Sequence, residues 1–388
     1  MWYFRSPLIA FGEDALAHLA THDSMRAFIV TDQVMNSLGF VERLRSQLGA
    51  IGCESMCFDE VEPDPSLETV RRCGQAMLAY QPDWVIGLGG GSCLDAAKAA
   101  WLVYERPDVD LMAVAPFEQY GLRAKARFIT IPTTAGSGAE VTAGAVITDR
   151  VESRKMEVAS YELVPDLTIV DPSFSAGMSP QLTADTGIDV LTHAVEGYSS
   201  TFANDFSDAM CVYATRMVFD YLPRAYSAGS YDREARTKMA NAATIAALGM
   251  GNSHIAMAHS MGHSLGMVFH LPHGRVTGLS LPYTVEFTAN GGCGRYVALA
   301  QVLGLPADGE IQAANNLAEA TRDLLERINL PVNLQQAGIT RQEFDANLEK
   351  LCDLMEMDSA LATSRRFPYR DEMKQLFEYA FIGREVDF

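Results

Sequence analysis

The sequence has few basic residues, and this shortage excludes whole classes of partner. Its 388 residues include 30 Lys and Arg against 49 Asp and Glu, a formal net charge of −19. Because nucleic-acid phosphates and anionic membrane surfaces attract positively charged proteins, we expect neither as a partner. The sequence also lacks any charge-free run of about 18 apolar residues, so it predicts no membrane-spanning helix.

Cysteine is scarce as well. The seven cysteines are scattered along the chain, and none forms a Cys-x-x-Cys pair. The sequence therefore indicates neither a zinc ribbon, nor a redox dithiol, nor a disulfide scaffold. No basic segment leads into an apolar one near the N-terminus, so we expect no signal peptide. These features predict a cytoplasmic protein with reduced thiols.

The first part of the chain alternates strand-like and helix-like patterns. Short apolar runs predict strands over 26–32, 83–88, 127–132 and 167–170. Helical patterns lie between them, around 41–48, from about 66, and over 94–104. Such alternation predicts a parallel sheet covered by helices.

After residue 172 strand patterns become rare. Ser179 followed by Pro180 predicts the start of a helix that runs to about Ser199. Further helices are expected over 205–221, 233–250, 255–268, 311–328, 341–355 and 372–380, with one short strand near 276–281. We therefore predict an α/β domain over residues 1–172, of the Rossmann-like kind, and an all-α domain over 173–388.

A glycine-rich turn follows the second predicted strand. Residues 87–98 read GLGGGSCLDAAK, and consecutive glycines after a strand let the backbone approach a ligand closely. Ser92, with Asp95 three residues later, predicts the N-cap of the next helix, and a helix N-terminus attracts anions. The turn thus predicts a phosphate or pyrophosphate site; a turn without a ligand is the alternative.

Two other strand ends carry candidate nucleotide contacts. Residues 132–140, PTTAGSGAE, follow one strand, and Asp32 ends another. Because strand C-termini converge in a doubly wound sheet, both loops are expected to line one nucleotide. A carboxylate at Asp32 would bind ribose hydroxyls and repel a 2′-phosphate, which favours NAD over NADP. A helix-capping role for Asp32 fits the sequence equally well.

Five of the eight histidines lie between residues 254 and 273. Asp189 and His193 are one helical turn apart, as are His259 and His263, and His273 follows in a predicted loop. Two helices and a loop can therefore present a carboxylate and several imidazoles to one cation, with Fe(II) or Zn(II) best matched to such ligands. The spacing leaves open which histidines bind the metal.

Four motifs together carry a resemblance to a known family. GGGSCLDAAK, PTTAGSGAE, DVLTHAVEGY and HSMGHSLGMVFHLPHG occur in this order, and the set resembles the iron-containing (group III) alcohol dehydrogenases. The resemblance implies a two-domain, dehydroquinate-synthase-like fold. The chain departs from the family over 360–368, where relatives often carry a Cys…Asn-Pro-Arg pattern, so the substrate of no single relative is carried over.

The resemblance also implies roles for individual residues. It implies Asp189, His193, His259 and His273 as metal ligands, with His263 beside the metal as a proton relay. The nucleotide-binding residues that it implies are Asp32, Gly89, Gly90, Gly91, Ser92, Asp95, Thr133, Thr134 and Ser137.

The function implied is the reversible oxidation of a small alcohol to its aldehyde or ketone. The cofactors would be NAD(H), with NADP as the alternative, and Fe2+, with Zn2+ as the alternative, in a homo-oligomer such as a dimer. A polyol or glycerol-type dehydrogenase and a dehydroquinate-synthase-like lyase share the fold, and a non-catalytic sensor is a third interpretation. Asp189 with His193 favours the alcohol dehydrogenases, because the metal-binding set of the synthases begins with Glu instead of Asp. A phosphate-bearing substrate would need a cluster of Lys and Arg near the metal motifs, and no such cluster adjoins them.

Overall fold

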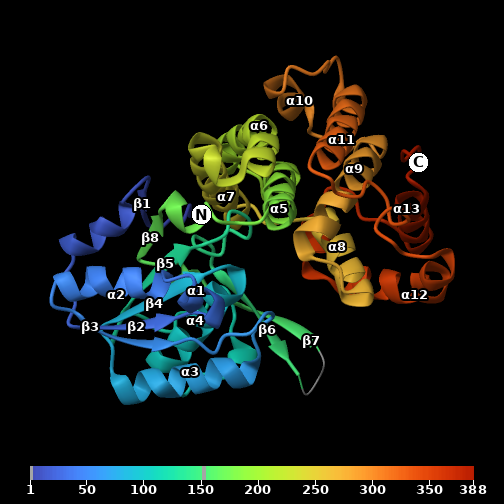
Figure 1. Cartoon of the computed structure of the whole chain (residues 1–388). Coiled ribbons are helices and arrows are strands. Elements are labelled where there is room, and N and C mark those ends of the chain that lie inside the picture. The colour runs from blue at the N-terminus through green and yellow to red at the C-terminus, as the bar shows by residue number, and fades with distance from the viewer. Residues whose placement is uncertain (1–2, 151–153) are drawn as a thin grey trace. The chain divides into compact units, whose positions relative to one another are not determined.

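The computed structural model describes residues 3–150 and 154–388, and the chain forms two compact units (Figure 1). The N-terminal unit comprises residues 1–177 and the C-terminal unit residues 178–388.

The N-terminal unit is built on one parallel sheet of six strands. In spatial order these are β1 (Leu8–Phe11), β8 (Leu167–Val170), β5 (Arg127–Pro132), β4 (Trp84–Gly89), β2 (Arg26–Val30) and β3 (Glu54–Phe58). The four interior strands confirm the predicted ones, and the edge strands β1 and β3 are additional. β4 and β5 end together, since Gly89 lies opposite Pro132.

Both faces of this sheet are covered, which explains the nearly continuous apolar runs of its strands. Successive residues of a strand point to opposite faces, so Phe28 packs in one core and Ile29 in the other. The first core includes α3 (Leu67–Tyr80) and α4 (Gly91–Glu105). The second includes η1 (Ala15–Thr21) and α2 (Phe40–Ala50).

Smaller elements complete the N-terminal unit. α1 (Gln33–Ser37) follows β2, and β6 (Gly144–Asp149) pairs with β7 (Arg154–Ala159) as an antiparallel hairpin that the sequence patterns did not predict. Like η1, the short elements η2 (Leu111–Ala113), η3 (Tyr161–Leu163) and η4 (Pro172–Phe174) are 3-10 helices.

The C-terminal unit, all of which the structure describes, contains helices and no strand. They are α5 (Pro180–Ser199), α6 (Asp205–Ala228), η5 (Gly229–Tyr231), α7 (Arg233–Gly251), α8 (Met257–Phe269), α9 (His273–Asn290), α10 (Val297–Val302), α11 (Glu310–Arg327), α12 (Arg341–Met357), η6 (Ser359–Thr363) and α13 (Arg370–Ile382). Together with the parallel sheet, they confirm the predicted fold class. Among the described residues, no helix combines the length and apolarity that a bilayer crossing requires.

Two local predictions in this unit have different outcomes. The Ser179 side chain accepts a hydrogen bond from the Leu182 amide and caps α5, as predicted. The short strand predicted near 276–281 is wrong, because this segment lies inside α9. Residues 276–289 of that helix are buried all round, and a helix without a polar face loses the periodicity that identifies it.

Candidate active site

Helix α5 carries the first two residues of a buried polar cluster. Asp189 and His193 lie one turn apart among apolar neighbours, and both are almost fully buried. The His193 Nε2 atom lies 3.9 Å from Asp189 Oδ2. A carboxylate and an imidazole thus share one face of the helix.

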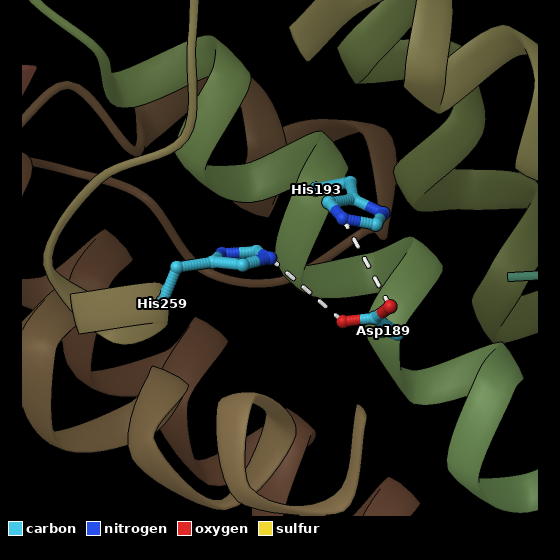
Figure 2. A group of neighbouring side chains, drawn as sticks. All are labelled: Asp189, His193 and His259. Carbon is cyan, nitrogen blue, oxygen red and sulfur yellow. Dashed lines mark ion pairs between the residues drawn. The ribbon is translucent and has the colours of Figure 1, made fainter. Parts of the chain in front are cut away.

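Helix α8 brings His259 to the same place (Figure 2). Its Nε2 atom lies 3.8 Å from Asp189 Oδ1, and its ring centroid lies 4.9 Å from that of His193. One nitrogen or oxygen atom from each of the three residues lies within 4.8 Å of the others. Figure 2 shows the three side chains pointing toward one another.

Helix α9 contributes His273, which the sequence patterns placed in a loop. The loop prediction is wrong: His273 is the first residue of α9, directly after the N-cap residue Pro272. Its Nε2 atom lies 3.5 Å from Asp189 Oδ1, and its ring centroid lies 5.5 Å from that of His259. Its side chain is about half exposed, so this side of the cluster is open to solvent.

Glycines let α9 pack directly against α5. A Cβ atom added at Gly274 would lie 2.0 Å from the carbonyl oxygen of Asp185, and one at Gly278 would lie 2.5 Å from Ile188. Arg275, between them, forms a bidentate ion pair with Asp185. Arg275 is a single basic residue beside the metal motifs, not a cluster, and its charge is already paired with a carboxylate.

The charges within the cluster suit metal binding. Burial raises the pKa of Asp189, but the three neighbouring imidazoles and a hydrogen bond from Thr277 outweigh it and lower that pKa to about 2. Burial, reinforced by His193, holds the pKa of His259 well below its usual value. Asp189 is thus an anion and His259 a neutral imidazole, the forms in which each binds a metal.

Two nitrogens of the cluster also have no protein partner. The Nε2 atom of His259 and the Nδ1 atom of His193 are buried without a hydrogen-bond partner among the described residues. An unpaired buried polar atom costs about 1–3 kcal/mol, and a cation bound beside Asp189 would offset this cost at His259 Nε2, the orphan atom that lies 3.8 Å from Asp189 Oδ1. Nitrogen and carboxylate donors match Fe2+ or Zn2+, so the residues fit a divalent metal.

His263 lies next to this cluster but is held differently. Its Nδ1 atom lies 2.8 Å from Asp358 Oδ2, and its ring stacks on that of His273 with centroids 5.2 Å apart. Its side chain is 37% exposed. His263 therefore touches both the cluster and solvent.

Two carboxylates were missed by the sequence reasoning. Asp358 contacts His263, and Glu196 Oε2 lies 2.5 Å from His259 Nδ1. Burial raises the pKa of Glu196 to about 7, although hydrogen bonds from two backbone amides lower it. Glu196 follows His193 within the DVLTHAVEGY motif, so a second acidic group in an apolar helix was an available signal. Asp358 lies 95 residues from His263 in the sequence, so no sequence signal indicated their contact.

The glycine turn in the N-terminal unit differs from its prediction in one respect. Gly90 is the N-cap residue of α4, and Ser92 lies inside that helix, so the predicted N-cap role of Ser92 is wrong. Gly89 has φ +151°, and a Cβ atom there would lie 2.6 Å from Cys93 Sγ. This backbone conformation and the close contact explain why glycine is required at the end of β4.

The two predicted nucleotide loops lie together, because β4 and β5 are neighbours. The Thr133 amide donates a hydrogen bond to the Gly89 carbonyl at 3.0 Å. A Cβ atom at Gly90 would lie 3.4 Å from Thr134, and one at Gly91 would lie 3.1 Å from Ser137. The Thr133 hydroxyl is buried without a hydrogen-bond partner in the described part of the chain, which leaves it available to a ligand.

The two predicted acidic contacts already have partners within the unit. Asp95 accepts a hydrogen bond from the Val146 amide at 3.0 Å, so its side chain is directed to β6. Asp32 caps α1 by accepting from the Met35 amide at 2.9 Å, which is the alternative role considered for it. Its other oxygen lies 3.3 Å from the Cys93 thiol, so Asp32 still lies beside the glycine turn.

Comparison with known proteins identifies the family. A family model described as iron-containing alcohol dehydrogenase matches residues 6–172, and one for the C-terminal part of the Fe-containing alcohol dehydrogenases matches residues 183–381. The chain belongs to the iron-containing alcohol dehydrogenase family. It is accordingly an oxidoreductase of alcohols and aldehydes.

Relatives within this family differ in length. The NADPH-dependent butanol dehydrogenase of Clostridium saccharobutylicum is 35% identical over 382 residues, which cover 98% of each chain. The aldehyde-alcohol dehydrogenase of Streptococcus pneumoniae serotype 4 is 37% identical over 96% of this chain, but only 45% of that longer protein is covered. The chain thus spans less than half of the second relative.

Solved structures of similar proteins have the same fold. The iron-containing alcohol dehydrogenase from Thermococcus thioreducens is 28% identical, with a TM-score of 0.89 over 99% of this chain and 100% of that one. The sulfoacetaldehyde reductase from Bifidobacterium kashiwanohense, solved in complex with NAD+, is 26% identical, with a TM-score of 0.86 over 98% of each chain.

Proposed function

We propose that the chain catalyses the reversible oxidation of a small alcohol to its aldehyde or ketone with NAD(H) and a divalent metal. The observation that carries this proposal is the buried convergence of Asp189, His193 and His259, with the unpaired Nε2 atom of His259 beside the carboxylate. Family membership supplies the reaction class.

Asp189, His193, His259 and His273 are the proposed metal ligands. We propose Fe2+ as the native ion and Zn2+ as a functional substitute, because both accept this donor set. When bound, such a cation supplies Lewis acidity toward a substrate oxygen. Asp189 contributes the negative charge, and the imidazoles contribute neutral donors.

His263 is the proposed proton relay. Its Nδ1 atom is held by Asp358, which orients the ring and leaves Nε2 for proton exchange. Because the side chain is partly exposed, the proton released from the alcohol can pass through His263 to solvent. This is general acid–base catalysis by a positioned histidine.

The nucleotide is proposed to bind at the glycine turn of residues 89–92 and the loop of residues 133–137. Backbone amides at the start of α4 suit a pyrophosphate, and the NAD+ complex of the reductase relative supports a dinucleotide. We propose NAD over NADP because of the Asp32 carboxylate, although the butanol dehydrogenase relative is named NADPH-dependent. Residues 1–172 would thus bind the nucleotide and residues 173–388 the metal.

The proposed setting is a cytoplasmic homodimer. All seven cysteines are free thiols, in keeping with a reducing compartment. Leu8 and Phe11 on the edge strand β1 are exposed apolar side chains, which favours an association at that edge. Light scattering of the purified chain measures the assembly directly.

The proposal is tested by metal analysis and an alcohol screen. Protein purified without oxygen is analysed for bound metal, stripped with a chelator, and reloaded with Fe(II) or Zn(II). NADH formation is then followed over a panel of primary and secondary alcohols, with NADP in parallel. We expect metal-dependent NADH formation that is lost in Asp189→Ala and retained in His270→Asn, which changes an exposed histidine outside the cluster. Full activity of the stripped protein, or no activity with any alcohol, would overturn the proposal.

A further inference from the structure

Glu196 contacts a helix start and a proposed metal ligand at once. It lies on α5 and is 3% exposed. Its carboxylate accepts hydrogen bonds from the backbone amides of Ala256 and Ala258, and it lies 2.5 Å from His259 Nδ1. All three partners come from the N-cap and first turn of α8.

Helix α8 has no cap of its own. Its N-cap residue is Ala256, which has no side chain that can accept a hydrogen bond. The first amides of a helix need acceptors, and a carboxylate there also compensates the helix dipole. Glu196 of α5 supplies both the acceptor and the negative charge. Helix α5, which carries Asp189 and His193, therefore also fixes the start of α8, which carries His259.

The same carboxylate fixes which nitrogen of His259 is free. Two backbone amides can only donate, so both favour Glu196 as an accepting carboxylate. The nearby Nδ1 atom then carries the imidazole proton, and Nε2 keeps its lone pair. That Nε2 atom is the buried, unpartnered one that lies 3.8 Å from Asp189.

From these contacts we infer that Glu196 is a positioning residue, which caps α8 from a different helix and holds His259 with Nε2 directed at the metal. This inference rests on the proposed metal site. The carboxylate acts through His259 and through the amides at the start of α8. A carboxylate that orients a ligand histidine in this way commonly strengthens metal binding about 10- to 100-fold.

Glu196→Gln tests the inference with almost no change in volume. The amide of Gln can donate to Nδ1, which would move the imidazole proton to Nε2 and block the ligand atom. Glu105→Gln is the matched control, because Glu105 is 4% exposed and accepts from the amides of Ala124, Lys125 and Ala126 without a histidine partner.

Zn2+ affinity is measured by calorimetry, and Co2+ absorption bands report the coordination. We expect Glu196→Gln to weaken Zn2+ binding about 10- to 100-fold and to alter the Co2+ spectrum. Glu196→Asp, which keeps the charge, should regain part of the affinity, and Glu105→Gln should match the unchanged chain. Equal Zn2+ affinity in Glu196→Gln and the unchanged chain would overturn the inference.

A measurement on the unchanged chain does not depend on a variant that folds. Nitrogen-15 NMR of the metal-free protein in slightly alkaline buffer should show His259 protonated at Nδ1 and bare at Nε2. A proton on Nε2 would overturn the inference. If the unchanged chain bound neither Zn2+ nor Co2+, the proposed function would fail, while the NMR result would still decide how Glu196 holds the ring.

Discussion

The histidines of the C-terminal unit differ in burial and in the acid that holds them. His259 is fully buried, and its Nδ1 atom is held by Glu196, a residue of another helix. His263 is partly exposed and is held by Asp358. A buried ring with a bare nitrogen suits a permanent ligand, whereas a ring at the surface suits repeated proton exchange.

Replacement of His263 separates these roles. His263→Ala should lower kcat about 100-fold or more, because the relay is lost, while bound metal stays close to one ion per chain. Steady-state kinetics and metal analysis of the same preparation measure both quantities. Loss of the metal together with activity would show that His263 is itself a ligand.

Asp32→Asn tests the choice of nucleotide. The amide oxygen can still cap α1 at Met35, but the negative charge at the proposed ribose site is removed. We expect kcat/KM with NADPH to rise about 10-fold or more relative to NADH, since a like charge no longer faces the 2′-phosphate.

Asp110→Asn is the matched control for Asp32→Asn. Asp110 also caps a short helix, by accepting from the Met112 amide, and its replacement should leave the ratio unchanged. An unchanged ratio in Asp32→Asn would show that the carboxylate does not face the nucleotide.

At the scale of helices, the distance between α5 and α9 determines how close His273 lies to Asp189. Gly274→Ala places a Cβ atom 2.0 Å from Asp185 O and 2.9 Å from Asp189 Cβ, so α9 must move and His273 must move with it. We expect a loss of about 1–3 kcal/mol in the free energy of unfolding and weaker Zn2+ binding. Denaturant titration and calorimetry measure the two effects.

Gly309→Ala is the control, because an added Cβ atom there meets nothing within 4 Å. It should leave Zn2+ affinity unchanged. If Gly274→Ala bound Zn2+ as tightly as Gly309→Ala, the position of α9 would not govern the site.

The sequence patterns predicted elements well where a short continuous apolar run or a recognisable cap marks them. The interior strands have apolar residues on both faces, and helices such as α5 begin at a recognisable cap. The patterns failed for β3, an edge strand of mixed residues that is only partly buried, and for the hairpin of β6 and β7. They also failed inside α9, where burial on every side removes periodicity.

Contacts between distant residues set the other limit. The spacing of Asp189 and His193 is local, so it could be read as a pair on one helix face. Glu196 and His259 lie 63 residues apart, and only the packing of α8 on α5 shows that they meet. The prediction that Ser92 caps α4 is wrong because the N-cap residue of this helix lies two residues earlier, at Gly90.

At the scale of the whole chain, each unit has its own proposed ligand. The nucleotide loops lie entirely within residues 1–177, and the metal cluster lies entirely within residues 178–388. A ligand stabilises the folded form that binds it by mass action, about 2.7 kcal/mol at a hundred times its dissociation constant. Each ligand should therefore stabilise mainly the unit that binds it against unfolding.

Hydrogen exchange followed by mass spectrometry tests this separation. Zn2+ should slow amide exchange in α5 and in the first turns of α8 and α9, whereas NADH should slow it around residues 87–98 and 132–140. Some amides exchange only when the whole unit unfolds. Their exchange should slow about 100-fold when that unit binds its ligand. Protection of the glycine turn by Zn2+ alone would place the metal outside the proposed cluster.

The places of the ligands along their helices have a consequence for how long a metal ion stays bound. Asp189 and His193 lie in the middle of α5, whereas His259 and His273 lie in the first turns of α8 and α9. Helix ends fray far more readily than helix centres. Dissociation of the ion would then begin at the start of α9, which has no side-chain cap and carries the half-exposed His273, while the other three ligands stay in place, so recapture can compete with escape.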